Sequence, residues 1–311
     1  MLKYALRRIG ETIPTTIGIL LLTFVLFNVV GGSPAETMLG KNATAEAIAA
    51  FNHKYGYDRP LVWALDSQFV RFVGDICKGD FGYSIENQES VLSVLARGVG
   101  PSLSLTLPIL VIGVVLALAL AMVSAEMRGR APDKAILVGS TILMSVNYVV
   151  WVLAGQFFLS YQAGIFPVWG YQNAFYLVLP VLIGVVSSLG VDVRFFRTAI
   201  LDELYKPYVL VARSKGLSRG AIMVRHVLRN ALIPIVTYVS LSIPYLFTGS
   251  LLLESFFGIP GLGSVSINAI HSADMAVVRT VVVLGALLYQ FVNLITDLLY
   301  AALDPRVRIG K

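Results

Sequence analysis

Long uninterrupted apolar runs, separated by shorter polar segments, dominate the pattern of this chain. The runs approach or exceed the roughly 20 residues that a helix needs to cross a bilayer. They do not alternate with polar residues, which favours spanning helices over barrel strands. The pattern predicts an all-α integral membrane protein with six spanning helices, at about Ile9–Val30, Ser102–Ser124, Ala135–Leu159, Phe175–Leu189, Leu232–Leu253 and Val277–Tyr300.

The composition agrees with a membrane protein. Of the 311 residues, 57% are hydrophobic and only 14% are charged, whereas soluble domains carry about 25% charged residues. Most of the surface therefore does not face water, and soluble folds are excluded. The single cysteine, Cys77, rules out an internal disulfide, and we interpret it as a small apolar side chain.

The placement of Lys and Arg orients the spans, because cytoplasmic segments are enriched in both residues. With a cytoplasmic N-terminus, 17 bases lie inside and seven outside. Four stretches follow: a first helix at 1–30, an extracytoplasmic subdomain at 31–100, a five-helix transmembrane domain at 101–303 and a cytoplasmic tail at 304–311. A cytoplasmic loop occupies about 192–231 of the third stretch.

The two long polar segments differ in charge. The outer segment 31–100 has eight acids and six bases, with helical spacing at Ala45–Tyr55 and an apolar stripe along Leu61–Ile76. We interpret it either as a small helical subdomain on the outer face or as a loop that packs against the spans. The inner segment 192–230 has eight bases and three acids. It either contacts a protein or is held by anionic lipid head groups.

Seven short motifs, in order and on the expected sides of the membrane, favour a protein contact for the inner segment. The chain resembles the inner-membrane permeases of binding-protein-dependent ABC importers, and within them the first permease type of the dipeptide/oligopeptide subfamily. The resemblance covers nearly the whole chain. The motifs are Leu6-Arg-Arg8 with Pro14 and Thr23-Phe24, Gly32-Ser-Pro-Ala35, Tyr55-Gly-Tyr-Asp-Arg-Pro-Leu61 with Gly79-Asp-Phe-Gly-Tyr-Ser84, Tyr208-Val, Ala212-Arg-Ser-Lys-Gly-Leu217, Glu254-Ser-Phe-Phe-Gly-Ile-Pro-Gly-Leu-Gly263, and Asn293-Leu-Ile-Thr-Asp297 with Tyr300 and Asp304-Pro-Arg306.

Two positions depart from the broader importer family. Leu210-Val-Ala212 stands where that family often has Glu-Ala-Ala, and Leu228-Arg229 stands where it often has Leu-Pro. Both departures are similar to the peptide-permease variant. They bear on the fine geometry of the cytoplasmic loop.

The resemblance implies a transport subunit that forms half of a path for peptides delivered by an extracellular binding protein. It implies a heterodimer with a second homologous permease and two ATP-binding subunits, which hold ATP and Mg. The location implied is the bacterial or archaeal cytoplasmic membrane, with lipid contacts and no nucleic acid. Members of the broad family that carry nickel, glutathione or oligosaccharides give alternative cargoes.

The chain itself offers no catalytic machinery in its sequence. Its nearest approach to a Walker motif, Gly40-Lys41, continues with Asn42 in place of the required Ser or Thr. The three histidines lie on two sides of the membrane and predict neither a metal cluster nor a catalytic triad. We therefore expect a non-enzymatic subunit that binds no cofactor and is moved by partner ATPases.

The resemblance assigns ATPase coupling to the cytoplasmic loop. We predict a coupling helix at Arg213–Ile222, with Gly216 as a hinge or cap where a side chain would clash. Arg225 and Arg229 are four residues apart and share a helix face, where they pair with acids of the ATPase or with lipid phosphates. The predicted coupling residues are Tyr208, Ala212, Arg213, Lys215, Gly216, Leu217, Arg225, His226, Arg229 and Asn230.

The outer turn after the fifth predicted span combines three glycines and a proline within eight residues, 256–263. Irregular backbone near membrane depth is tolerated only where it is buried in protein or lines a cavity. The turn is either a re-entrant element at the outer mouth of the path or an ordinary turn with aromatic anchors. Its candidate residues are Glu254, Phe257, Pro260, Gly261 and Gly263.

A few polar residues fall inside predicted spans. Gln290, Asn293 and Asp297 recur at spacings of three and four and so share one face. They either bond neighbouring helices or line the path. Asn147 and Gln156 are further candidates. No charged residue is predicted at the centre of a span, which disfavours a self-sufficient secondary transporter.

Overall fold

A computed structural model describes residues 2–30, 35, 39–40, 43–55, 57–62, 64, 66–84, 86–244 and 250–303 of the protein. Side chains are described for these residues except 2–6, 29–30, 54–55 and 298–303. The motif positions 32–34, 41–42 and 56, the side chain of Tyr300 and the predicted tail 304–311 lie outside this description. The chain forms two compact units, one from residues 1–98 with 265–311 and one from 99–264.

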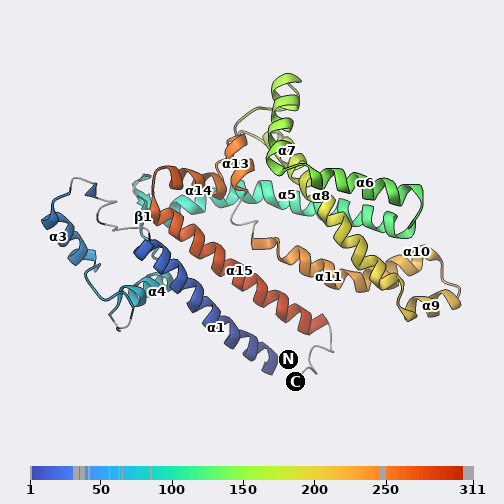
Figure 1. The fold of residues 1–311 in the computed structure, drawn as a ribbon, viewed down its shortest axis with the longest axis horizontal. Coiled ribbons are helices and arrows are strands. Elements are labelled where there is room, and N and C mark those ends of the chain that lie inside the picture. Colours follow the sequence, from blue (N-terminus) through green and yellow to red (C-terminus); the bar gives the residue numbers. More distant parts are fainter. Residues whose placement is uncertain are drawn as a thin grey trace. The chain divides into compact units, whose positions relative to one another are not determined.

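The first unit is built on two long antiparallel helices. Helix α1 (Leu2–Val25), which continues as the π-helical segment η1 (Leu26–Val30), packs along α15 (Met275–Leu303) (Figure 1). An ion pair of 3.4 Å joins Arg8 near the start of α1 to Asp297 near the end of α15. The start of α1 and the end of α15 therefore lie at the same end of this pair.

The outer segment of the first unit contains two helices and a short hairpin. These are α3 (Ala45–Tyr55), at the predicted place, α4 (Gln68–Lys78), and the antiparallel strands β1 (Tyr83–Ser84) and β2 (Glu89–Ser90), in which Tyr83 pairs with Ser90. Helix α4 begins seven residues later than the stripe at Leu61–Ile76 predicted. The reason is a cap, because the Ser67 side chain accepts a hydrogen bond from the Val70 amide.

Helix α4 packs on the spans of the first unit. Phe72 of α4, Leu20 and Phe24 of α1, and Val283 of α15 form one buried cluster. The Phe24 and Phe72 rings lie 5.7 Å apart. The hairpin is tied to the start of α15 by a hydrogen bond of 2.6 Å from Ser84 Oγ to the buried Asp274 carboxylate. The outer segment is therefore helical and also held against α1 and α15.

The second unit contains most of the remaining helices. They are α5 (Val91–Glu126), whose first turns belong to the other unit, α6 (Ala131–Ser145), α7 (Tyr148–Ala154), η2 (Gly155–Gln162), α8 (Phe175–Leu204), α9 (Pro207–Ser214), α10 (Arg219–Ile222), η3 (Met223–Leu228), α11 (Arg229–Ser240), α13 (Leu251–Phe257) and α14 (Leu262–His271), which continues into the other unit. Helix α8 packs against both α6 and α11.

The third predicted span is not continuous. The chain bends by 89° between Ala131–Ser145 and Tyr148–Gln162. Asn147 causes the break, because it adopts an extended conformation and its side chain accepts a hydrogen bond from the Val149 amide, which starts a new helix. The predicted span at Ala135–Leu159 is therefore broken at Asn147 and is not one continuous helix.

The fourth and fifth spans also have ends other than predicted. Helix α8 continues to Leu204, past the expected end at Leu189, so that residues 192–204 are helix and not loop. The fifth helical run begins in the predicted loop, at Arg219, and ends at Ser240, well before the expected Leu253. Both helices have buried apolar residues at helical spacing within 192–230. The prediction treated this segment as a loop because of its many charged residues.

Five helices of the described chain are long and apolar enough to cross a membrane, and up to seven spans result if each of two bent pairs counts as one. The predicted number of six lies in this range. The cores of the second unit are two apolar clusters. One joins α5, α8, α9 and α11 around Phe196 and Ile200, and the other joins α5, α7, α8 and α13 around Leu179 and Phe257.

Candidate functional site

The polar loop between the fourth and fifth spans is a compact elbow, which we define as residues 205–218. Lys206 is extended, Pro207 occupies the first turn of α9, and α9 ends at Ser214. Gly216 then adopts a φ of +76°, and the Ser218 side chain caps α10 by accepting from the Ala221 amide. Proline at the start and glycine just past the end are the residues that favour such helix limits.

This arrangement corrects the predicted coupling helix. The helix of the elbow covers Pro207–Ser214, whereas Arg213–Ile222 contains the turn and two different helices. Gly216 ends the helix as predicted, but not because a side chain would clash there. A Cβ on Gly216 would meet no atom within 4 Å, so the need for glycine comes from its positive φ.

One face of α9 is fixed to the rest of the unit. Val209 and Ala212 are buried in the same apolar cluster as Met223 and Val227 of η3. The Tyr208 hydroxyl donates to Glu203 Oε2 over 2.9 Å, which ties α9 to the last turn of α8. Burial raises the pKa of the Tyr208 hydroxyl above its ordinary value.

The other face of α9 is open. Leu210 is 68% exposed and Val211 is 56% exposed, and Leu217 follows at 41%. Arg213 and Lys215 lie exposed beside them, and neither forms an ion pair with any residue that the structure describes. The elbow therefore presents an apolar surface bordered by bases, on a helix whose opposite face is buried.

The remaining predicted coupling residues lie on η3 and α11. Arg225 and Arg229 are both exposed. The Asn230 side chain donates to the main-chain oxygen of His226 over 3.0 Å, and the Tyr208 hydroxyl lies 3.5 Å from the same oxygen. Tyr208, His226 and Asn230 therefore shape the elbow, while the two arginines stay accessible.

The outer turn surrounds a buried carboxylate. Glu254, on α13, has no exposed surface. Its Oε1 accepts from Ser102 Oγ at 2.8 Å and from the Ser250 amide at 3.0 Å, and its Oε2 accepts from the Gly263 amide at 2.6 Å and the Ser264 amide at 3.2 Å. One side chain thus satisfies three main-chain N–H groups and joins the turn to α5.

Two of the three glycines of this turn, Gly261 and Gly263, lie directly against the same carboxylate. A Cβ on Gly261 would collide with the Glu254 carboxyl group and Ser102 Oγ, and a Cβ on Gly263 would lie 2.8 Å from Glu254 Oε2. Phe257 is buried in the apolar cluster of α7 and α8, whereas Pro260 is exposed. The predicted turn residues therefore form one packed and hydrogen-bonded element.

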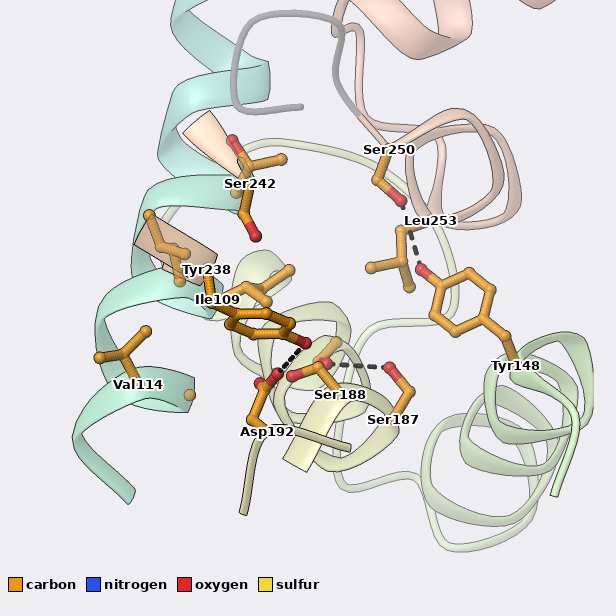
Figure 2. Close-up of a pocket in the computed structure, with 14 residues that line it drawn as sticks. Ile109, Val114, Tyr148, Ser187, Ser188, Asp192, Tyr238, Ser242, Ser250 and Leu253 are labelled. Carbon is orange, nitrogen blue, oxygen red and sulfur yellow. Dashed lines mark hydrogen bonds between the residues drawn. The ribbon is translucent and has the colours of Figure 1, made fainter. Parts of the chain in front are cut away.

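A cavity of about 400 Å³ lies within the second unit, among α5, α7, α8, α11 and α13 (Figure 2). Asp192 of α8 and Tyr238 of α11 meet in it, with the Tyr238 hydroxyl donating to Asp192 Oδ1 over 2.9 Å. Across the cavity, Tyr148 Oη and Ser250 Oγ lie 3.2 Å apart. Figure 2 shows the two hydrogen-bonded pairs on different walls.

Comparison with known proteins places these features in a family. Residues 113–309 match the model of the binding-protein-dependent transport system inner membrane component, and residues 1–106 match the model of the N-terminal part of such membrane components. The chain belongs to this family. It is an inner-membrane permease of the ABC importer class, of the peptide type.

Similar permeases are known from several bacteria. The glutathione transport system permease protein GsiC of Salmonella paratyphi A is 32% identical over 309 residues, covering 99% of both chains. The same-named protein of Escherichia coli is 31% identical over 309 residues, also covering 99% of both. A probable peptide ABC transporter permease protein of Sinorhizobium fredii is 31% identical over 313 residues, covering 98% of this chain and 99% of its own.

Of the five polar residues predicted inside the spans of the permease, three form hydrogen bonds or an ion pair. Asn147 caps α7, and Gln156 Nε2 donates to the main-chain oxygens of Val168 and Phe256, each over 2.9 Å. Asp297 pairs with Arg8. Gln290 and Asn293 are partly buried on α15. None of these five predicted residues is among the described residues that line the cavity of Figure 2.

The permease also has two polar groups that the sequence did not single out. Asp192 was missed because the fourth span was ended at Leu189, which placed it in a loop, so the expectation of no charged residue within a span was wrong for α8. The buried residues Val193, Phe196 and Ile200 that follow at helical spacing were the available signal.

The second group is a clamp in which Arg197 Nε and Nη2 donate to both oxygens of the buried Asp133, at 2.9 and 3.0 Å.

Proposed function

We propose that this permease forms half of a translocation path for short peptides, moved by ATPases that dock on the elbow. An extracellular binding protein delivers the cargo to the outer face. The main support for this proposal is the difference between the two faces of α9. Val209 and Ala212 are buried on one face, whereas Leu210 and Val211 are exposed on the other. Exposed apolar residues on an anchored helix are typical of a surface that a partner covers.

The elbow is continuous with the helices around the cavity. Asp192 lies 12 residues before the end of α8, or about 18 Å along a helix at 1.5 Å per residue. On the other side of the elbow, the helical run from Arg219 to Ser240 carries Tyr238. A displacement of the elbow by an ATPase would therefore move both members of the Asp192–Tyr238 pair, which supports a mechanical mode of coupling.

The finer assembly is part of this proposal. The permease pairs with a second, homologous permease, and two ATPases bind ATP and Mg and hydrolyse the nucleotide. Both termini face the cytoplasm of a bacterium or archaeon. The positive-inside count supports this orientation, and the Arg8–Asp297 ion pair supports placing the start of α1 and the end of α15 on one side.

The cargo follows from relatives named for peptide and glutathione transport. Glutathione is itself a tripeptide, so both names point to short peptides as the chemical class. The binding protein docks on the outer segment, which is ordered against α1 and α15 by Phe72 and by the Ser84–Asp274 hydrogen bond. Glutathione is the second candidate cargo, and parallel uptake assays with glutathione and ordinary tripeptides distinguish the two.

The test is reconstitution of both permeases, the ATPases and the binding protein in proteoliposomes, with ATP supplied on the ATPase side. We expect ATP-dependent uptake of a labelled tripeptide and its loss in Leu210→Glu, since a charge on the exposed apolar face opposes docking. The ATPases should no longer co-purify with that variant. Leu61→Glu is the matched control for ATPase co-purification only, because Leu61 is also exposed, at 45%, but lies in the outer segment, where the binding protein and not the ATPase is proposed to dock.

Two results would reject the proposal. One is normal ATPase binding and uptake by Leu210→Glu. The other is robust cargo flux through the permease alone, driven by an ion gradient without ATPases.

A further inference from the structure

Asp192 is an acidic residue in the middle of a spanning helix, and it faces a cavity (Figure 2). Ionisable residues within spans are rare and usually serve a functional site. The cavity volume of about 400 Å³ falls within the roughly 300–1,000 Å³ of small-molecule sites. It is therefore large enough for one end of a short peptide.

The charge environment of Asp192 is incomplete. Tyr238 donates one hydrogen bond to the carboxylate, and the Ser188 hydroxyl is its other polar neighbour. Among the residues that the structure describes, no Lys, Arg or His lies within ion-pair distance of it. An ionised carboxylate can accept about four hydrogen bonds, and a charge in an apolar setting is stable only when it is paired. A buried carboxyl group without such a partner is stabilised in its neutral form, so a cationic ligand would bind here by pairing with the ionised form.

The rest of the cavity is amphipathic. Ile109, Val114 and Leu253 supply apolar walls, while Tyr148 and Ser250 place two hydroxyl groups on the wall away from Asp192. A ligand that fits has a cationic end, an apolar body and further polar groups a few ångströms away. The N-terminal end of a peptide has this chemistry, because its ammonium group is followed by a carbonyl and a side chain.

We propose that Asp192 is a specificity-determining residue that binds the primary ammonium group of the cargo, with Tyr238 holding its carboxylate in place. The inference rests on the proposed function, since it assumes a peptide cargo. Because Asp192 lies on α8 and Tyr238 on α11, movement of the elbow changes this pair and thereby the affinity for the amine. The ammonium of an aminophospholipid has the same chemistry, and the test separates the two sources.

The experiment uses the complete transporter in vesicles of phosphatidylcholine and phosphatidylglycerol, which contain no primary amine. Uptake is compared for a tripeptide with a free N-terminus and the same tripeptide with an acetylated N-terminus. In Asp192→Asn we expect uptake of the free-amine peptide at low concentration to fall about tenfold, in line with loss of one charge-assisted hydrogen bond. Uptake of the acetylated peptide should stay the same.

The binding protein has its own preference between the two peptides, but it is identical in every variant, so its contribution cancels in the comparison. Both radiolabelled peptides are also equilibrated with the complex without the binding protein, which measures the permease alone. Tyr238→Phe should reduce the preference for the free amine by a smaller factor, because the carboxylate remains. Asp192→Glu should restore part of it.

Glu126→Gln is the matched control. It removes an exposed carboxylate at the end of α5, outside the cavity, and should leave both peptides unaffected. Equal losses for both peptides in Asp192→Asn, or no loss for either, would overturn the assignment to the cargo amine. A variant effect that arises only when phosphatidylethanolamine is added would assign the site to lipid and also overturn it. Failure of the unmodified complex to take up either peptide would instead count against the proposed function.

Discussion

The buried Glu254 carboxylate gives the sharpest test of the outer turn. Glu254→Gln keeps the shape of the side chain but replaces one acceptor oxygen by an NH₂ group. The carboxylate accepts from three main-chain amides and one hydroxyl, divided between its two oxygens. A glutamine can satisfy the donors on one side only, because its NH₂ group cannot accept.

The destabilisation expected for Glu254→Gln depends on which way the glutamine amide group is turned, and the more favourable of its two orientations sets the value. If the glutamine oxygen faces the Gly263 and Ser264 amides, the NH₂ group faces Ser102, whose hydroxyl can turn to accept, and the Ser250 amide, which cannot. One buried N–H then stays unsatisfied, at a cost of about 1–3 kcal/mol. The opposite orientation leaves two such groups. We therefore expect Glu254→Gln to destabilise the permease by about 1–3 kcal/mol.

The assay is SDS-induced unfolding of the purified permease in mixed micelles, with peptide uptake by the whole transporter as a second measurement. Glu126→Gln provides the matched change at an exposed site and should stay within about 0.5 kcal/mol of the unmodified protein. If Glu254→Gln were equally harmless, the carboxyl group would have to carry a proton and donate one of these bonds. The described role of Glu254 as an acceptor of four hydrogen bonds would then be wrong.

Two further predictions concern the elbow and the pair formed by Arg197 and Asp133. Gly216→Ala should destabilise the elbow by about 1–2 kcal/mol and weaken ATPase co-purification, because the φ of +76° at this position is unfavourable for L-residues. Gly216→Asn should destabilise the elbow less. Equal effects of the two variants would show that backbone conformation is not the cause. Arg197→Met should cost about 3–5 kcal/mol in SDS unfolding, because it leaves the buried Asp133 charge unpaired. Asp133→Asn added to Arg197→Met should recover part of this loss, and strictly additive effects would contradict the clamp.

Local pattern was sufficient for much of the fold. The apolar runs predicted the spanning helices because crossing a bilayer requires a long stretch without charges, whatever the stretch packs against. The end of a helix at Gly216 was likewise readable, since a glycine between two helix-prone segments favours a left-handed cap. The ends of the helices were harder to predict, because a capping side chain or a buried partner determines them. The late start of α4 and the length of α8 are examples.

The site was readable only in part. Gly261 and Gly263 stood out by residue type, but the reason for them is Glu254, whose partner Ser102 lies 152 positions away in the chain. Asn147 and Gln156 were candidates either for bonding within the helix bundle or for lining a path, and the structure shows that both form hydrogen bonds with main-chain atoms. A polar residue within an apolar run does not reveal by itself which neighbour it meets.

The sequence by itself determined that this protein crosses a membrane several times and that its motifs are those of an importer permease, and its clustered bases predict a cytoplasmic loop. These properties depend on hydropathy, charge and short motifs, which are local. Only the tertiary structure decided which face of α9 is exposed, and that Asp192 meets Tyr238, 46 positions later, in a cavity. Such contacts depend on how distant helices pack, because a hydrogen bond exists only where packing brings its donor to its acceptor.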